Sequence, residues 1–215
     1  MNKPHSLLQI SIHGTDGSLS SFTQDDAASV QRILNDLQRP DFFSRVRIII
    51  AGQSSLTILV TSKIARIDLV GEGLGKWNPK WPADAPEFTE ISEHEFLFER
   101  EARDLEPADR TGRRLATGQR FAGLLDVHLL GGQHIYMKLH GITALPAERV
   151  QKIHDLLTLP GLWFRLPGAG VSLIHLSGAI KFIAYPGPAE VPAETWLANE
   201  QQVLCANRGA NFQDK

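Results

Sequence analysis

Histidines are the residues in this chain whose spacing suggests metal binding or acid–base chemistry. The chain has 215 residues and eight histidines. His13 and His140 each precede a glycine at the end of an alternating apolar–polar segment. If the two segments are related by a twofold axis, these histidines meet in a shared groove. The alternative is that each one hydrogen-bonds to nearby backbone at the end of a strand.

A second histidine set, His128, His134 and His140, has a regular spacing of six residues. The dipeptide Gly131–Gly132 predicts a two-residue hairpin turn, which pairs His128 with Ile135 and turns it away from His134. His134 and His140 then lie about 20 Å apart on one strand. A zinc site needs three or four ligands, so the sequence predicts no metal site and no cofactor.

Two further positions are candidates for ligand or partner binding. His175 occupies a strand position where an earlier, similar segment has Val60, so it marks either a specialised pocket or a hydrogen-bonded residue at the edge of the core. Trp77 and Trp81 flank a proline-containing stretch. They form either an aromatic binding surface or a lid over the apolar end of the first unit.

The common signatures of nucleotide binding and nucleophilic catalysis are absent from the sequence. The glycines in 71–76 follow a predicted strand, but the Trp- and Pro-rich residues after them cannot start the helix that a phosphate loop requires. There is no Gly-x-Ser-x-Gly motif, and Cys205 has no basic neighbour before Arg208. The sequence therefore favours a non-enzymatic role without excluding an enzyme.

Composition narrows the choice of class further. The 22 basic and 24 acidic residues give a formal charge of −2, which makes nucleic acid an unlikely partner. One cysteine cannot form an internal disulfide framework. No apolar run reaches the length of a membrane span, so we expect no membrane insertion and a cytoplasmic location.

The sequence also contains an internal repeat. Segments 30–45 and 150–165 align without a gap and share six identical residues, and shorter matches flank them in the same order. Each copy contains an amphipathic helix ended by a proline and followed by β-branched strand segments. The predicted unit is therefore β-α-β-β-β, a two-layer arrangement in which the helix covers the sheet.

The expected fold class is α+β: a tandem duplication of this unit, packed as a pseudo-twofold dimer. Small β-barrel-like units with one helix each are the alternative. The predicted division is a first repeat (1–90), a charged connecting segment (91–120) and a second repeat with an added N-terminal hairpin (121–215). For residues 92–100, helix and strand remain open, although Ser92 and Glu95 have capping-box spacing.

These features lead to three functional hypotheses. The first is a non-enzymatic interaction or regulatory protein that binds a protein partner or a second copy of itself. The second is a small-ligand binder or enzyme with a site between the repeats, using His13, His140 or His175. The third is a weak RNA-binding protein with small-barrel-like units.

Overall fold

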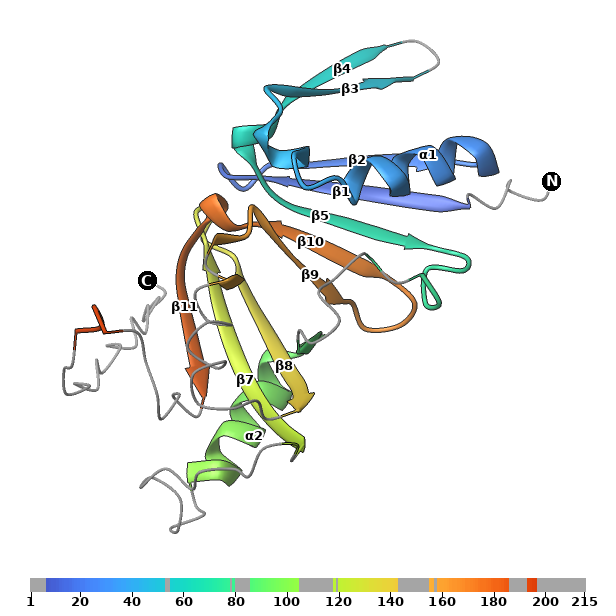
Figure 1. Cartoon of the computed structure of the whole chain (residues 1–215). Helices are drawn as coiled ribbons and strands as arrows, with labels where there is room; N and C mark the ends of the chain where they lie inside the picture. The colour runs from blue at the N-terminus through green and yellow to red at the C-terminus, as the bar shows by residue number, and fades with distance from the viewer. Residues whose placement is uncertain are drawn as a thin grey trace, which may run out of the picture.

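The computed structural model describes residues 7–52, 55–77, 79, 86–104, 118, 120–142, 155–156, 158–185 and 193–196. These residues form a mixed α+β fold with few helices and one large sheet (Figure 1). The strands are β1 (Leu8–Gly14), β2 (Leu19–Gln24), β3 (Arg47–Ala51), β4 (Leu56–Val60), β5 (Ile64–Gly71), β6 (Glu87–Ile91), β7 (Arg120–Leu129), β8 (His134–Ile142), β9 (Gly161–Arg165), β10 (Val171–His175) and β11 (Ala179–Tyr185). The helices are α1 (Ala27–Leu37) and α2 (Glu93–Asp104), with 3₁₀ helices η1 (Phe42–Ser44), η2 (Thr61–Lys63) and η3 (Leu176–Gly178).

Strands from both halves of the chain share the large sheet. Its nine strands lie in the order β11-β7-β8-β6-β9-β10-β5-β1-β2, while β3 and β4 form a separate two-stranded sheet. β5 and β10 pair antiparallel and join the halves, and β6 pairs parallel with β9. Among the described residues, no helix is long and apolar enough to cross a bilayer.

Two apolar cores lie on opposite faces of this sheet. Because side chains alternate along a strand, β10 contributes Val171 and Leu173 to one core and Ile174 to the other. Core 1 packs under α1 and contains Leu8, Ile10, Ile12, Leu34, Leu37, Phe42, Phe43, Ile64, Ile67, Leu69, Leu74, Val171 and Leu173. Core 2 contains Ala65, Phe88, Leu125, Val127, Leu129, Ile135, Met137, Leu162, Phe164 and Ile174.

The predicted first helix is α1, with Leu34 and Leu37 of the apolar stripe buried in core 1. Asp26 caps its N-terminus, since the side chain accepts a hydrogen bond of 2.7 Å from the Ser29 N–H. The second predicted helix lies largely outside the described residues. The helix proposed for 193–207 also falls mainly outside them, and residues 193–196 are not helical.

The segment between the halves contributes a strand, β6, to the large sheet and a helix, α2, that packs on it. β6 pairs with β8 and β9, and α2 follows it directly. Ser92 caps α2 by accepting a hydrogen bond from the Glu95 N–H, as the capping-box spacing predicts. The structure therefore selects the helix for residues 93–100. Figure 1 shows α2 lying along β7 and β8, far from α1.

Both halves begin with a hairpin, which the predicted β-α-β-β-β unit does not include. The missed strand is β2, whose sequence LSSFTQ has only two large apolar residues and lies at the sheet edge. The β7–β8 hairpin is consequently not an addition peculiar to the second half. In each half a hairpin is followed by a second strand pair, a 3₁₀ helix and a last strand that pairs with the first.

Candidate functional site

The turn of the β7–β8 hairpin sets which side chains share a face. Leu129 N–H donates to the Gln133 carbonyl (2.8 Å), and Gly132 has a φ of +78°, so the loop has three residues and not two. His128 therefore pairs with His134, and the predicted pairing with Ile135 is wrong. A change of one residue in register turns a side chain to the other face, so both histidines face outward together.

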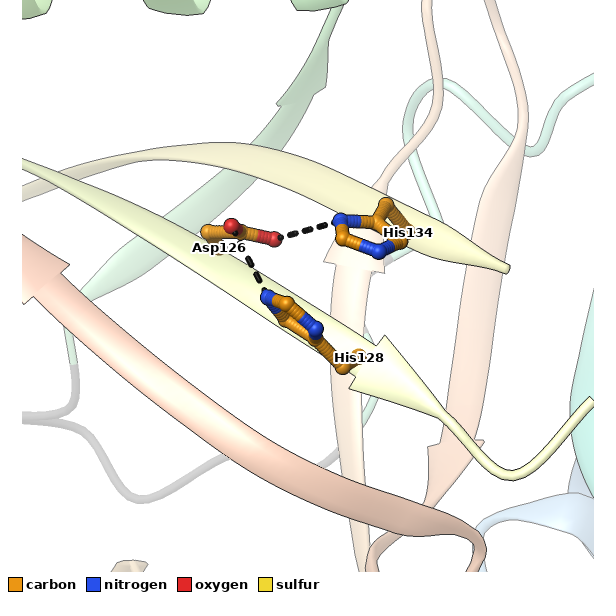
Figure 2. Close-up of side chains that lie close together, drawn as sticks. All are labelled: Asp126, His128 and His134. Carbon is orange, nitrogen blue, oxygen red and sulfur yellow. Dashed lines mark hydrogen bonds and ion pairs between the residues drawn. The ribbon is translucent and has the colours of Figure 1, made fainter. Parts of the chain in front are cut away.

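Asp126 lies between these two histidines (Figure 2). Its Oδ2 lies 3.0 Å from Nε2 of His128, and its Oδ1 lies 3.4 Å from Nδ1 of His134. The two imidazole centroids are 3.9 Å apart. One potential ligand atom from each of the three residues lies within 4.8 Å of the others. We call these three residues the Asp–His–His cluster.

The cluster is buried at the carboxylate and open at one histidine. The Asp126 side chain is 13% exposed, whereas that of His134 is 42% exposed. Within the part of the chain that the structure describes, Asp126 Oδ1 is buried and accepts no hydrogen bond, despite its 3.4 Å distance to His134. A buried carboxylate oxygen without a donor is costly, so the arrangement is suited to binding a cation.

Tyr136 and α2 border the cluster on β8. The Tyr136 hydroxyl donates to Glu93 Oε1 (3.3 Å) and lies 3.5 Å from Nδ1 of His134. Its ring packs against Phe96 of α2, which is fully buried. Burial and the carboxylates of Glu93 and Asp126 raise the pKa of Tyr136, so the phenol stays protonated.

His13 belongs to a different polar network, on the core 2 face of the sheet. Its Nε2 lies 2.9 Å from Asp68, which also accepts hydrogen bonds from Arg66 (2.6 Å) and the Ser172 hydroxyl (2.6 Å). Arg66 reaches Glu90 of β6 through two further hydrogen bonds of 3.1 and 2.8 Å. This network, rather than local backbone, holds the His13 ring.

Burial raises the pKa of Asp68, but the hydrogen bond from His13 and the Arg66 charge outweigh burial. The net effect is a pKa below the ordinary value, so Asp68 is ionised at neutral pH. Arg66 keeps its charge, because Asp68 and Glu90 more than compensate for its own burial and raise its pKa. The network is therefore an ionic link between β1, β5 and β6.

The other predicted site residues do not converge. Besides Asp68, His13 reaches the turn of the β7–β8 hairpin, where Gln133 Nε2 lies 3.5 Å from His13 Nδ1. His140 is exposed and lies six residues beyond His134 on β8, which is about 20 Å. The structure therefore does not bring His13 and His140 together.

His175 is buried at the end of β10. Its ring stacks on Phe43 at a centroid distance of 4.1 Å, and Nδ1 lies 3.2 Å from the Ile64 carbonyl. Burial lowers its pKa, so the ring is neutral. Trp77 packs on core 1 and contacts Trp163 edge-on at 5.3 Å, which fits the lid interpretation. Trp81 lies outside the described residues.

The sheet of β3 and β4 exposes an apolar face. Its inner face packs on core 1 through Ile48, Ile50 and Leu59. The large apolar residues of the outer face are between 48% and 62% exposed: Ile49 54%, Leu56 62%, Ile58 56% and Val60 48%. Among the described strands, β4 pairs with β3 alone, so its other edge is open. Apolar patches of this kind commonly mark interaction surfaces.

Comparison with known proteins gives no assignment: no family model, no curated protein and no solved structure matches this chain. Sequence reasoning missed Asp126, although Asp-x-His on a strand places both side chains on one face. The exposed face of β3–β4 was also detectable in the sequence. Segment 47–51 has three consecutive isoleucines, which put apolar side chains on both faces of a strand.

Proposed function

We propose that this chain is a non-enzymatic interaction protein, built from two copies of one unit, that associates with a second copy of itself. The observation that carries the proposal is the exposed apolar face and open edge of β4. The enzyme or ligand-binding alternative and the RNA-binding alternative stay predictions, because no specific contact favours either one.

The recurrence of elements at a constant distance in the chain supports the duplication. β4 (Leu56–Val60), η2 and the start of β5 recur 115 positions later as β10 (Val171–His175), η3 and the start of β11. The hairpin turns recur with the same offset: Gly17, with a φ of +82°, corresponds to Gly132, with a φ of +78°. Because the turns match, β1 corresponds to β7 rather than to the segment before His140.

The pairing of β5 with β10 indicates what β4 lacks. Leu69 pairs with Val171 and Ile67 with Leu173, and all four side chains are buried. The positions that correspond to Val171 and Leu173 are Leu56 and Ile58 on β4. The positions that correspond to Leu69 and Ile67 are Ala184 and Phe182 on β11, which lies at one edge of the large sheet. The apolar pairs between β5 and β10 are thus buried, whereas the equivalent positions on β4 and β11 are unpaired with each other and open.

The β5–β10 register, applied to β4 and β11, places Ile58 opposite Phe182. One position beyond the observed ladder, it places Val60 opposite Ile180. These four side chains are between 36% and 65% exposed. Cross-strand apolar pairs stabilise antiparallel ladders, and two open edges with matching faces are prone to pair.

We infer that β4 of one copy pairs with β11 of the other, and the reverse, in a twofold dimer. A twofold axis pairs the open edge of β4 and the open edge of β11 in each copy, so none of the four strand edges stays open. Two short strands per contact also keep the interface reversible at low protein concentration.

The test uses engineered cysteines in a Cys205→Ser background. One protein carries Ile58→Cys and a second carries Phe182→Cys, and the two are mixed and mildly oxidised. We expect a disulfide between the two different chains, because directly opposed residues on antiparallel strands lie within reach of one. The matched control replaces Ile58→Cys by Val70→Cys, an equally apolar and 48% exposed position on β5.

The outcomes separate the possible occupants of the surface. Cross-linked pairs of Ile58→Cys with Phe182→Cys, absent for Val70→Cys and accompanied by a dimer in light scattering, support the proposal. A cross-link within one chain of the double variant, with a monomeric mass, indicates that the hairpin closes on its own β11. No cross-link together with a monomer at all concentrations rejects the proposal, as does turnover in an activity screen.

A further inference from the structure

We propose that Asp126, His128 and His134 bind a divalent transition-metal ion of the Zn²⁺, Ni²⁺ or Cu²⁺ class. None of the three ligands lies on β4 or β11, so the site does not rest on the proposed dimer contact, although β11 pairs with β7 beside it and places Lys181 opposite His128. Two imidazoles and one carboxylate form a donor set that these ions favour over Mg²⁺ or Ca²⁺.

The spacing of the donor atoms fits an ion of this size. Ligand bonds of about 2.0–2.1 Å in tetrahedral geometry place neighbouring donor atoms about 3.3 Å apart. Here Oδ2 of Asp126 lies 3.0 Å from the His128 nitrogen, and Oδ1 lies 3.4 Å from the His134 nitrogen. One ligand atom from each of the three residues lies within 4.8 Å of the others, so an ion at the centre draws the ligands together by side-chain rotation. The ion provides Asp126 Oδ1 with the partner that it lacks among the described residues.

The backbone beneath the cluster is held by core 2. Val127 and Ile135, the neighbours of these ligands that point to the other face, are almost completely buried. His128 and His134 are directly paired across the two strands. A site on two paired strands is held more firmly than one on loops, so little ordering is needed on binding.

One side of the site is open, so the ion retains coordination positions for water or an external ligand. The 42% exposure of the His134 side chain provides the route of entry. The Tyr136 hydroxyl, which donates to Glu93, lies 3.5 Å from the same His134 nitrogen, Nδ1, and so borders the ion position. Three protein ligands with open positions are typical of exchangeable or catalytic sites rather than closed structural ones.

A comparison of the two halves indicates how many ions one chain binds. With the 115-residue offset, Asp126, His128 and His134 correspond to Ser11, His13 and Leu19 in the first half. That half retains one of three ligands, and its histidine is bound to Asp68. The chain therefore has a single site of this kind among its described residues, and we expect one ion per chain.

The test measures binding of Co²⁺ and Zn²⁺ alone to the full chain, prepared without a histidine tag. We expect saturable binding of one Co²⁺ with visible d–d absorption, displacement of Co²⁺ by Zn²⁺, and no competition from Mg²⁺. His134→Ala and His128→Ala weaken the affinity by at least about tenfold. The control is His140→Ala, an exposed histidine on the same strand and face, which leaves the affinity unchanged.

Circular dichroism and thermal unfolding check that each variant is folded. Because the His134 side chain is 42% exposed, we expect His134→Ala to fold, so it remains informative even if Asp126→Asn fails to fold. A rise in Tm with Zn²⁺ for the wild type and His140→Ala, absent in His134→Ala, supports the site. Weak, unsaturated Co²⁺ binding, or affinity equal in wild type and His134→Ala, overturns the proposal and leaves the cluster a hydrogen-bonded one.

Discussion

Arg66 is the residue on which the ionic network of the sheet depends. Its side chain is 11% exposed and lies between Asp68 and Glu90, with its guanidinium 5.2 Å from the ring centre of Phe164. Two carboxylates that are mostly removed from water are stable only with a nearby cation. The sequence places Arg66 and Asp68 two residues apart on a strand, but it gives no indication that Glu90, 22 residues beyond Asp68, lies beside them.

Replacing Arg66 with methionine removes that cation and leaves both carboxylates buried. We expect Arg66→Met to lower the free energy of unfolding by about 3 kcal/mol, measured by urea denaturation at neutral pH. The control is Arg39→Met, which breaks an exposed ion pair with Asp41 and changes stability little. Equal effects of the two substitutions contradict the role assigned to the network.

His175 makes the stability depend on pH in the neutral to mildly acidic range. Burial holds its pKa in the folded state below the unfolded value of about 6.5, so the unfolded chain binds the proton more readily. The contribution of His175 is therefore complete above about pH 6.5. It decreases as the pH falls from there toward the folded pKa and is constant below it.

His175→Gln isolates this contribution. The loss of unfolding free energy between about pH 7.5 and about pH 5.5 should be smaller in the variant than in the wild type. His140→Gln, which changes an exposed histidine, provides the comparison. If His175→Gln and the wild type lose stability in parallel over this range, the buried ring is not responsible.

At the level of elements, the sequence predicts those whose pattern is local. The apolar stripe predicts α1, and the β-branched runs predict β3, β4 and β5. For α2 the capping box favours a helix, but the alternation of residues 96–100 suits a strand equally. β2 was missed because it is polar and stabilised by its neighbour at the sheet edge. The Asp–His–His cluster was missed because one residue in the hairpin loop decides its register, and Gly131–Gly132 is compatible with loops of two or three residues.

Gly132 holds that register through its positive φ. A valine here must adopt the left-handed conformation, so Gly132→Val should cost about 1–2 kcal/mol, while Gly132→Asn should cost less. The space around this glycine is open, so a clash does not explain the difference. Urea denaturation measures both variants, and equal losses for valine and asparagine exclude the backbone explanation.

At the scale of the whole molecule, the halves are joined by one continuous strand pair rather than docked as separate domains. β10 is buried on both faces because it completes both cores, which explains why all five of its residues are inaccessible. β4, which the proposed duplication matches to β10, completes only core 1 and keeps one face exposed. In that proposal, one sequence pattern serves both an internal and an external surface.

The difference between β10 and β4 can be measured at Leu173 and Ile58, which the proposed duplication matches at the offset of 115. Leu173 is 3% exposed, so Leu173→Ala should destabilise the chain by about 2–4 kcal/mol at any protein concentration. Ile58 is 56% exposed in the single chain, so at low concentration Ile58→Ala should change stability by less than about 0.5 kcal/mol.

If β4 pairs with β11 of a second copy, the wild-type Tm rises with protein concentration, and the Tm of Ile58→Ala rises less. A wild-type Tm that is independent of concentration over a hundredfold range contradicts that pairing, while a large loss for Ile58→Ala at low concentration places the hairpin against its own chain.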